Sequence, residues 1–180
     1  MIAVSIAGTL TAVAVPQAVN ALDEYRVRAA AHYLAMRLGD MRIGAVKRST
    51  SVGLRFEPVG TDYRFTGVAD GDGDGLHTVD VQRGADPVLA APDMLAWHFT
   101  GVTFGILAGV PDADGNAAGT SDGVRIGASR LLSMNPNGSS SAGTLYVRGR
   151  GRAQYAVRIL GATGRVRVVR YDHARRKWVE

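Results

Sequence analysis

The chain has 180 residues, of which 46% are hydrophobic, and it contains no cysteine. This length suits one domain with its own core and an appended helix, and the lack of cysteine excludes disulfide scaffolds, thiolate chemistry and the usual zinc sites. The net charge of +5 is unevenly distributed: residues 57–147 include eleven acidic and four basic side chains, whereas residues 148–180 include two acidic and ten basic ones.

The first 22 residues carry no charge and are mostly apolar. A helix of that length would reach roughly 30 Å, the thickness of the hydrocarbon core of a bilayer. A secretory signal peptide would need a basic segment near its start, but the first basic residue is Arg26. A helix that is apolar all round and buried in a soluble core would need a larger protein around it. We therefore favour a hydrophobic helix over residues 1–22 that lies in a membrane or in the core of a filament.

The next segment, residues 23–50, has the pattern of an amphipathic helix. Its apolar residues recur at steps of three and four and form one stripe, made of Val27, Ala30, Leu34, Leu38, Met41 and Ala45. The charged residues of the segment fall away from this stripe. The pattern predicts that the stripe lies on a sheet, which residues 51–180 would supply as a β domain.

The apolar period changes to two at Ser51, which is typical of strands. Residues 52–56 and 63–68 predict a hairpin, and residues 76–82 and 94–107 also have strand composition. Residues 111–123 and 135–143 are rich in Gly, Asp, Asn and Ser and predict loops. Three closely spaced strands are predicted at the end of the chain, over residues 144–148, 153–160 and 165–171.

The N-terminal segment resembles a known family. The residues Met1-Ile-Ala-Val-Ser-Ile-Ala-Gly-Thr-Leu-Thr-Ala-Val-Ala-Val-Pro16, followed by a long charged helix, are similar to the mature N-terminal helix of type IV pilins and type II secretion pseudopilins. That helix normally opens with Phe-Thr-Leu-x-Glu after a basic leader that ends in Gly. Neither precedes Met1 here, so we expect the upstream reading frame to encode both.

The C-terminal part makes the resemblance more specific. The segments Asn135-Pro-Asn-Gly, Gly143-Thr-Leu-Tyr-Val and Ala156-Val-Arg-Ile-Leu-Gly-Ala-Thr-Gly-Arg-Val-Arg-Val resemble the C-terminal half of the GspH/FimT-type minor pseudopilins, and so does the approach to the first strand, residues 45–56. The resemblance implies an α+β, pilin-like fold in which the second half of a long helix packs on antiparallel sheet.

The resemblance also implies a function. The chain would be a structural minor pilin or pseudopilin of a type II secretion or type IV pilus system, and not an enzyme. Its partners would be other pilins and pseudopilins, with no small-molecule substrate. It would cross the bacterial inner membrane once and place its domain in the periplasm. The sequence leaves open which machine it serves.

One acidic segment could hold a calcium ion. Asp70, Asp72 and Asp74 alternate with glycines, as at the start of a calcium-binding loop, where several oxygens must converge on one point. Leu76 would add its carbonyl oxygen and Asp80 a further carboxylate, although the twelfth loop position is Val81, which has no ligand atom. The alternative is an acidic turn without a cation, so calcium is the one cofactor that the sequence suggests.

The basic C-terminal segment allows a second function. Some minor pilins of natural transformation carry a Gly-Arg-x-Arg motif that binds DNA, and Gly164-Arg-Val-Arg167 resembles it. Clustered arginines bind phosphates and release counterions. On this interpretation Arg165, Arg167, Arg170 and Arg152 would contact DNA. The alternative is a solvated sheet edge, or a surface that binds the acidic parts of neighbouring subunits.

Overall fold

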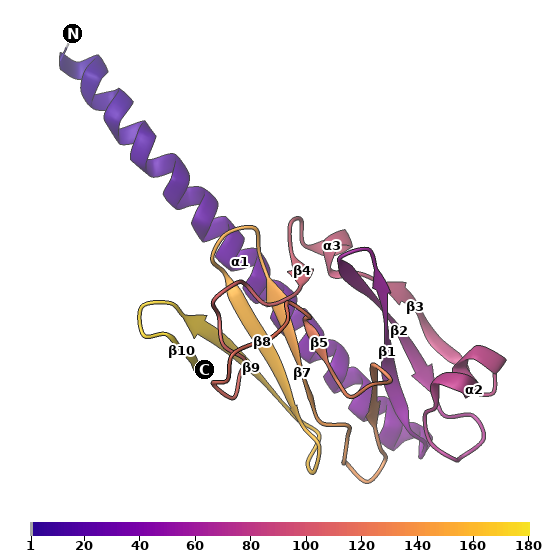
Figure 1. Cartoon of the computed structure of the whole chain (residues 1–180). Coiled ribbons are helices and arrows are strands. Elements are labelled where there is room, and N and C mark those ends of the chain that lie inside the picture. Colours follow the sequence, from indigo (N-terminus) through magenta and orange to yellow (C-terminus); the bar gives the residue numbers. More distant parts are fainter. Residues whose placement is uncertain (1) are drawn as a thin grey trace.

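The computed structural model describes the backbone of residues 2–180 and the side chains of residues 17–180. A single helix, α1 (Ile2–Arg48), opens the chain, and most of the regular structure after it consists of strands. The first half of α1 projects away from the domain, while its second half lies along the sheets (Figure 1). The predicted α+β arrangement, a long helix packed by its second half on antiparallel sheet, is confirmed.

Two antiparallel sheets form most of the regular structure that follows α1. The four-stranded sheet has the order β3-β2-β1-β6, with β1 (Val52–Val59), β2 (Asp62–Ala69), β3 (Val88–Asp93) and β6 (Leu131–Met134). The second sheet has the order β10-β9-β8-β7-β4, and β5 also pairs with β7. Its strands are β4 (Thr103–Phe104), β5 (Val124–Arg125), β7 (Gly143–Arg148), β8 (Gln154–Leu160), β9 (Arg165–Asp172) and β10 (Lys177–Val179).

The second half of α1 packs against both sheets, with contacts to β1 and β6 of one and β7, β8 and β9 of the other. All six residues of the predicted stripe are buried, and Leu34 and Leu38 are fully enclosed. They share one core with the inner faces of both sheets. The amphipathic pattern therefore identified the face of the helix that joins the two sheets.

Two strand predictions are wrong. Residues 76–82 overlap the helix α2 (Thr78–Arg83), whose C-cap Gly84 has the left-handed conformation with φ 81°. None of the α2 residues is buried, so its β-branched side chains have no sheet face to cover. Residues 94–107 contain α3 (Leu95–His98) and only the two-residue strand β4. The edge strands β3, β6 and β10 were not predicted from the sequence.

The predicted hydrophobic segment, residues 1–22, falls mainly on residues 1–16, whose side chains lie outside the described part of the chain. Over residues 17–180, no helix combines the length and the apolarity needed to cross a membrane.

Candidate functional site

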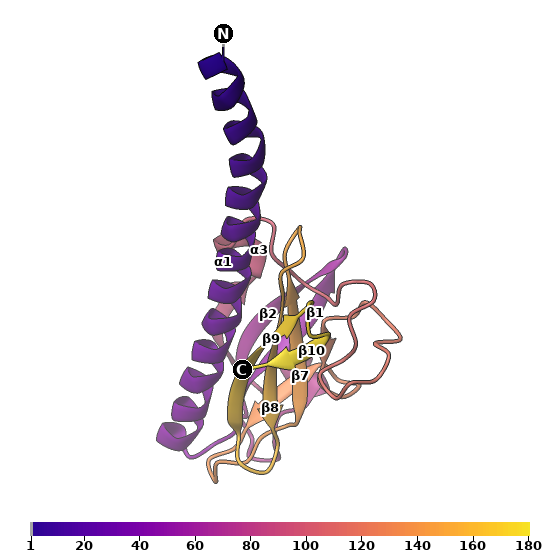
Figure 2. The same ribbon diagram turned by 90° about the vertical axis from the view of Figure 1, so that its left-hand side faces the viewer.

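The free face of α1 carries an apolar seam. Large hydrophobic side chains are exposed at Leu22, Tyr25, Met36 and Ile43, each by 47% or more. At about 100° per residue these positions lie opposite the buried stripe. Through Ala29, His32 and Gly39 they continue a spacing of three and four residues, which is the spacing of a helix that packs along another helix. In Figure 2 the helix runs along one side of the domain and its outer side is uncovered.

A carboxylate fastens α1 to the domain where the helix leaves it. The backbone amides of Arg150 and Gly151, in the β7–β8 turn, each donate a hydrogen bond of 3.0 Å to Asp23. A Cβ added at Gly149 would overlap the same carboxylate, so the turn needs glycine for this close approach. The glycines of Gly149-Arg-Gly-Arg152 therefore bind a side chain of the chain's own helix.

The next helix residue adds a second link. The hydroxyl of Tyr155 donates a 2.6 Å hydrogen bond to Glu24, and Arg170 lies 3.7 Å from the same carboxylate oxygen. Burial and the neighbouring Glu24 carboxylate raise the pKa of Tyr155 well above its ordinary value. We call the contacts of Asp23 and Glu24 with the six-stranded sheet the neck contacts.

A third polar cluster joins α1 to the end of β3. Tyr33 donates a 2.5 Å hydrogen bond to one oxygen of Asp93, and His98 lies 2.8 Å from the other. Burial and the bond to Asp93 raise the pKa of Tyr33 to about 12. Although burial acts in the opposite direction, the hydrogen bonds from Tyr33 and His98 hold the pKa of Asp93 below its usual range. The cluster positions α3 beside the helix.

The acidic loop brings three of its predicted ligands together. Carboxylate oxygens of Asp70, Asp72 and Asp74 lie within 4.8 Å of one another. Asp72 raises the pKa of Asp74 through a shared hydrogen bond and through charge repulsion. Asp80 lies on α2 and is not among the three converging carboxylates. The side chain of Leu76 lies over Gly53 of β1.

Sequence reasoning missed Asp86, which organises this loop. Asp86 is 1% exposed, and its two carboxylate oxygens accept hydrogen bonds of 3.1 Å from the amides of Gly71 and His77. Asp70 itself accepts hydrogen bonds from the amides of Gly73 and Gly75. The aspartates of this region therefore hold the loop closed by themselves. Asp86 stands alone between Ala and Pro in the sequence, and no motif marks it.

The four predicted DNA-binding arginines do not form one surface. Arg165 and Arg167 are exposed on the face of β9 that points away from α1, and Arg167 pairs with Glu180 at 3.1 Å. Arg170 lies on the opposite face of β9 and pairs with Glu24 of the helix. Arg152 is exposed in the β7–β8 turn, close to Arg170. The geometry does not support a common DNA contact for the four side chains.

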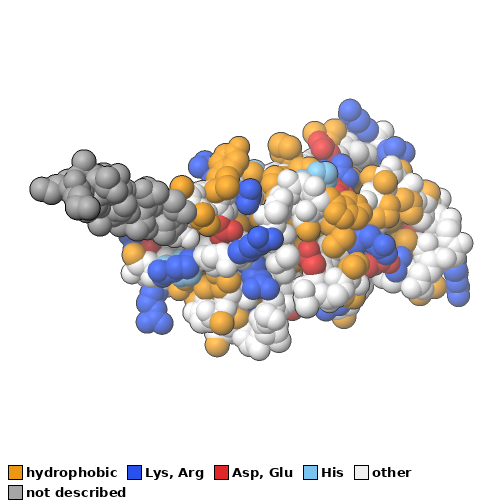
Figure 3. All heavy atoms as spheres, turned by 90° about the horizontal axis from the view of Figure 1, so that it is seen from above, with side chains coloured by type: hydrophobic (Ala, Val, Ile, Leu, Met, Phe, Trp, Pro, Cys, Tyr) orange, Lys and Arg blue, Asp and Glu red, His pale blue; other side chains and the backbone are white. Residues whose placement is uncertain are grey.

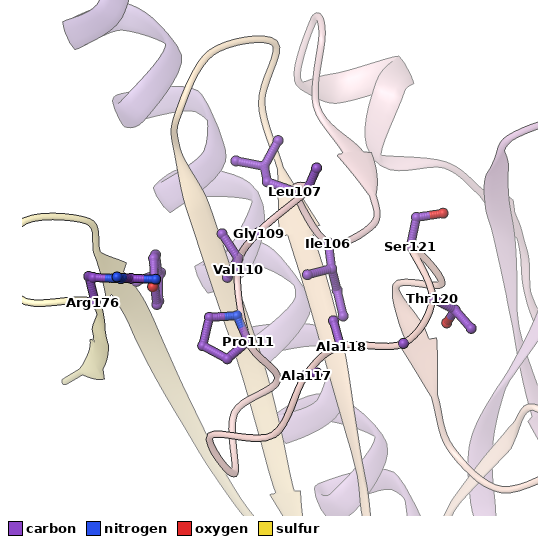
Figure 4. A pocket seen from close by; sticks show the side chains of 13 residues that line it. Ile106, Leu107, Gly109, Val110, Pro111, Ala117, Ala118, Thr120, Ser121 and Arg176 are labelled. Carbon is purple, nitrogen blue, oxygen red and sulfur yellow. The ribbon is translucent and has the colours of Figure 1, made fainter.

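An apolar depression lies on the outer face of the six-stranded sheet. The two arms of the loop over residues 105–123 line it, and Figure 4 shows Val110 and Pro111 facing Ile106 and Ala118 across it. Its volume is about 500 Å³. Arg176 and Tyr171 are the titratable side chains of this lining, so the depression resembles a contact surface more than a catalytic site.

Comparisons with known proteins give one similar structure. No protein-family model matches the chain. No curated protein matches it. A search of solved structures finds the chain similar to the minor pseudopilin EpsH from the type 2 secretion system of Vibrio cholerae, with 15% sequence identity and a TM-score of 0.48, over 81% of this chain and 97% of that one.

Proposed function

We propose that this chain is a structural subunit, a minor pilin or pseudopilin, of a filament of the type II secretion or type IV pilus class. Residues 1–22 would anchor it in the bacterial inner membrane, and the domain would lie in the periplasm. Its partners would be other pilins and pseudopilins, and its role would be structural rather than catalytic.

The two-faced helix α1 is the observation that carries this proposal. One face of its second half is part of the domain core, and the other face carries the apolar seam of Leu22, Tyr25, Met36 and Ile43. The first half projects away from the domain (Figure 1). A helix with a seam at this spacing is suited to lie along helices of other subunits.

Photo-cross-linking tests the proposal, with a photoreactive phenylalanine analogue placed either at Met36 or at Leu160. Both side chains are exposed, by 64% and 44%, but Leu160 lies on the sheet. In the native host, irradiation should link position 36 to the N-terminal helix of another filament subunit. Ile43→Lys in the same chain should reduce this product by placing a charge in the seam.

Position 160, which is exposed on the sheet, is the control for position 36. Position 160 should give no product with the helix of another subunit. Products of the same identity and yield from both positions, or a position-36 product that Ile43→Lys leaves unchanged, would contradict assembly through the seam.

A further inference from the structure

We propose that the end of the domain from which α1 projects is a membrane-docking surface for anionic lipid headgroups. The surface, which we call the rim, consists of Trp97, Tyr25, Arg26, Arg28, Arg150 and Arg152. The inference rests on the proposed function, because it requires the N-terminal segment to be held in a membrane. It adds that the domain itself contacts the lipid.

Contacts between three segments build the rim. The β7–β8 turn meets α1 at Asp23, through the amides of Arg150 and Gly151. The side chain of Arg150 extends over Gly101, where an added Cβ would lie 2.7 Å from its Nε, and this joins the turn to the segment after α3. Figure 1 shows α3 and the β7–β8 turn at the end of the domain where the helix leaves.

The aromatic side chains of the rim are exposed. Trp97 on α3 is 63% exposed and Tyr25 on α1 is 69% exposed. The other tryptophan, Trp178, donates hydrogen bonds to Pro111 and Asp112 and packs on Tyr146. Tryptophan and tyrosine favour the headgroup layer, where the ring is shielded from water and its polar atom is hydrated. Exposure of a large aromatic side chain beside a projecting hydrophobic helix fits that layer.

The arginines of the rim carry charge that the protein does not neutralise. Among the described residues, Arg26, Arg28, Arg150 and Arg152 form no ion pair. The acidic residues nearby have other partners: Asp23 and Glu24 form the neck contacts, and Asp172, which lies near Arg152, pairs with Arg175 at 3.7 Å. Seen from the end where the helix emerges, basic and hydrophobic side chains are both exposed around its base (Figure 3).

Distance separates the rim from the other basic side chains. The attraction of an anionic membrane falls off within about 8 Å at physiological salt. The helix from residue 23 to its end at Arg48 is roughly 35–40 Å long at 1.5 Å per residue. Arg42 lies near Gly138 and Gly164, at the far end of the domain, and should not feel the membrane. The rim arginines therefore differ from the distal ones in what they can contact.

The test uses the full chain reconstituted into phosphatidylcholine vesicles, with or without phosphatidylglycerol and with lipids brominated near the headgroup. Bromine quenches only tryptophans that lie close to it. Trp97 should be quenched, more strongly when phosphatidylglycerol is present, and the quenching should disappear in Trp97→Phe, which retains Trp178. In the paired variant Arg150→Gln with Arg152→Gln, phosphatidylglycerol should no longer increase the quenching of Trp97.

The matched control is Arg42→Gln with Arg165→Gln, which removes two exposed charges at the distal end and should leave the quenching unchanged. An equal loss of Trp97 quenching in both paired variants would mean that only the net charge matters, and it would overturn the proposal that the rim binds the membrane. If the chain inserts into the vesicles but Trp97 is not quenched, the proposed rim is overturned and the membrane anchor is not. A chain that fails to enter vesicles would overturn the membrane anchor and the rim together.

Discussion

Two adjacent acidic residues hold α1 against the sheet where the helix leaves the domain. Asp23 accepts hydrogen bonds from amides of the β7–β8 turn, while Glu24 accepts one from the hydroxyl of Tyr155. Sequence reasoning could find both residues as the first charges after the apolar segment, but not their partners more than 120 residues later. The sequence hint of this contact was the pair Gly149 and Gly151, because a turn without side chains at these positions allows a carboxylate to approach its backbone amides.

The neck contacts can be tested by a double-mutant cycle. Asp23→Ala removes two charge-assisted hydrogen bonds from a partly exposed site and should cost about 1–2 kcal/mol of unfolding free energy. Gly149→Ala should cost about 1–3 kcal/mol, because its methyl group would overlap the Asp23 carboxylate. The double variant should lose less than the sum, since removing the carboxylate makes room for the methyl group. Additive losses in denaturant unfolding would show that the two residues do not meet.

The cluster of Tyr33 and Asp93 predicts a loss of stability at high pH. The pKa of Tyr33 is raised to about 12 from its ordinary value of 10.0, so the folded state retains a proton that the unfolded state releases. Its contribution is therefore complete below pH 10 and is lost as the pH rises toward 12. Tyr33→Phe should flatten this part of the melting profile. Tyr25→Phe, on the free face of the same helix, should not, and an unchanged profile for Tyr33→Phe would contradict the assignment.

The helices and strands that were predicted correctly from the sequence are those in which apolar residues recur at regular steps and face the core. The stripe of α1 and the hairpin of β1 and β2 were correct, because burial of one face imposes a period that the residues must follow. Val166 and Val168 turn toward the helix while Arg165 and Arg167 turn away, as the alternation predicts. The free seam of α1 was not recognised, because Ala29, His32 and Gly39 interrupt its large side chains.

The helices and strands that were predicted wrongly or missed include those whose conformation depends on polar groups distant in the sequence. The segment over residues 76–82 looked like a strand because of Val79 and Val81, but its start is fixed by the buried carboxylate of Asp86 and its end by Gly84. The edge strand β3 contains Pro92 and pairs with β2 through register shifts, which hide its alternation. Periodicity carries no information about such contacts.

The acidic loop between β2 and α2 remains a candidate calcium site. Three carboxylates converge there, and a cation would relieve the repulsion between Asp72 and Asp74. Millimolar calcium should raise the melting temperature of the full chain by mass action, and chelator should reverse the shift. Asp72→Asn with Asp74→Asn should abolish the shift without disturbing Asp70, which holds the loop amides. Asp40→Asn, an exposed carboxylate on α1, is the control. A calcium shift that survives in the double variant would contradict the site.

For the whole molecule, the helix divides into a part that the fold needs and a part that it does not. Seven residues of α1 between Val27 and Ala45 belong to the core that joins the two sheets, whereas the described contacts with the domain begin near Asp23. The stripe of this helix packs on both sheets, and the sheets also meet directly, because Phe104 of β4 packs on Phe56 and Phe65 of the four-stranded sheet. The same helix therefore builds the domain and leaves its seam uncovered by the domain.

Truncation should separate these two roles. A fragment of residues 23–180 retains every described core residue and the neck contacts, so it should unfold cooperatively within a few degrees of the full chain. A fragment of residues 49–180 lacks the whole stripe, and loss of several buried side chains at about 2–5 kcal/mol for each large one exceeds the stability of an ordinary domain. It should show no cooperative melting by circular dichroism. A folded 49–180 fragment would mean that the sheets are stable without the helix, and an unfolded 23–180 fragment would mean that the projecting segment contributes to the fold.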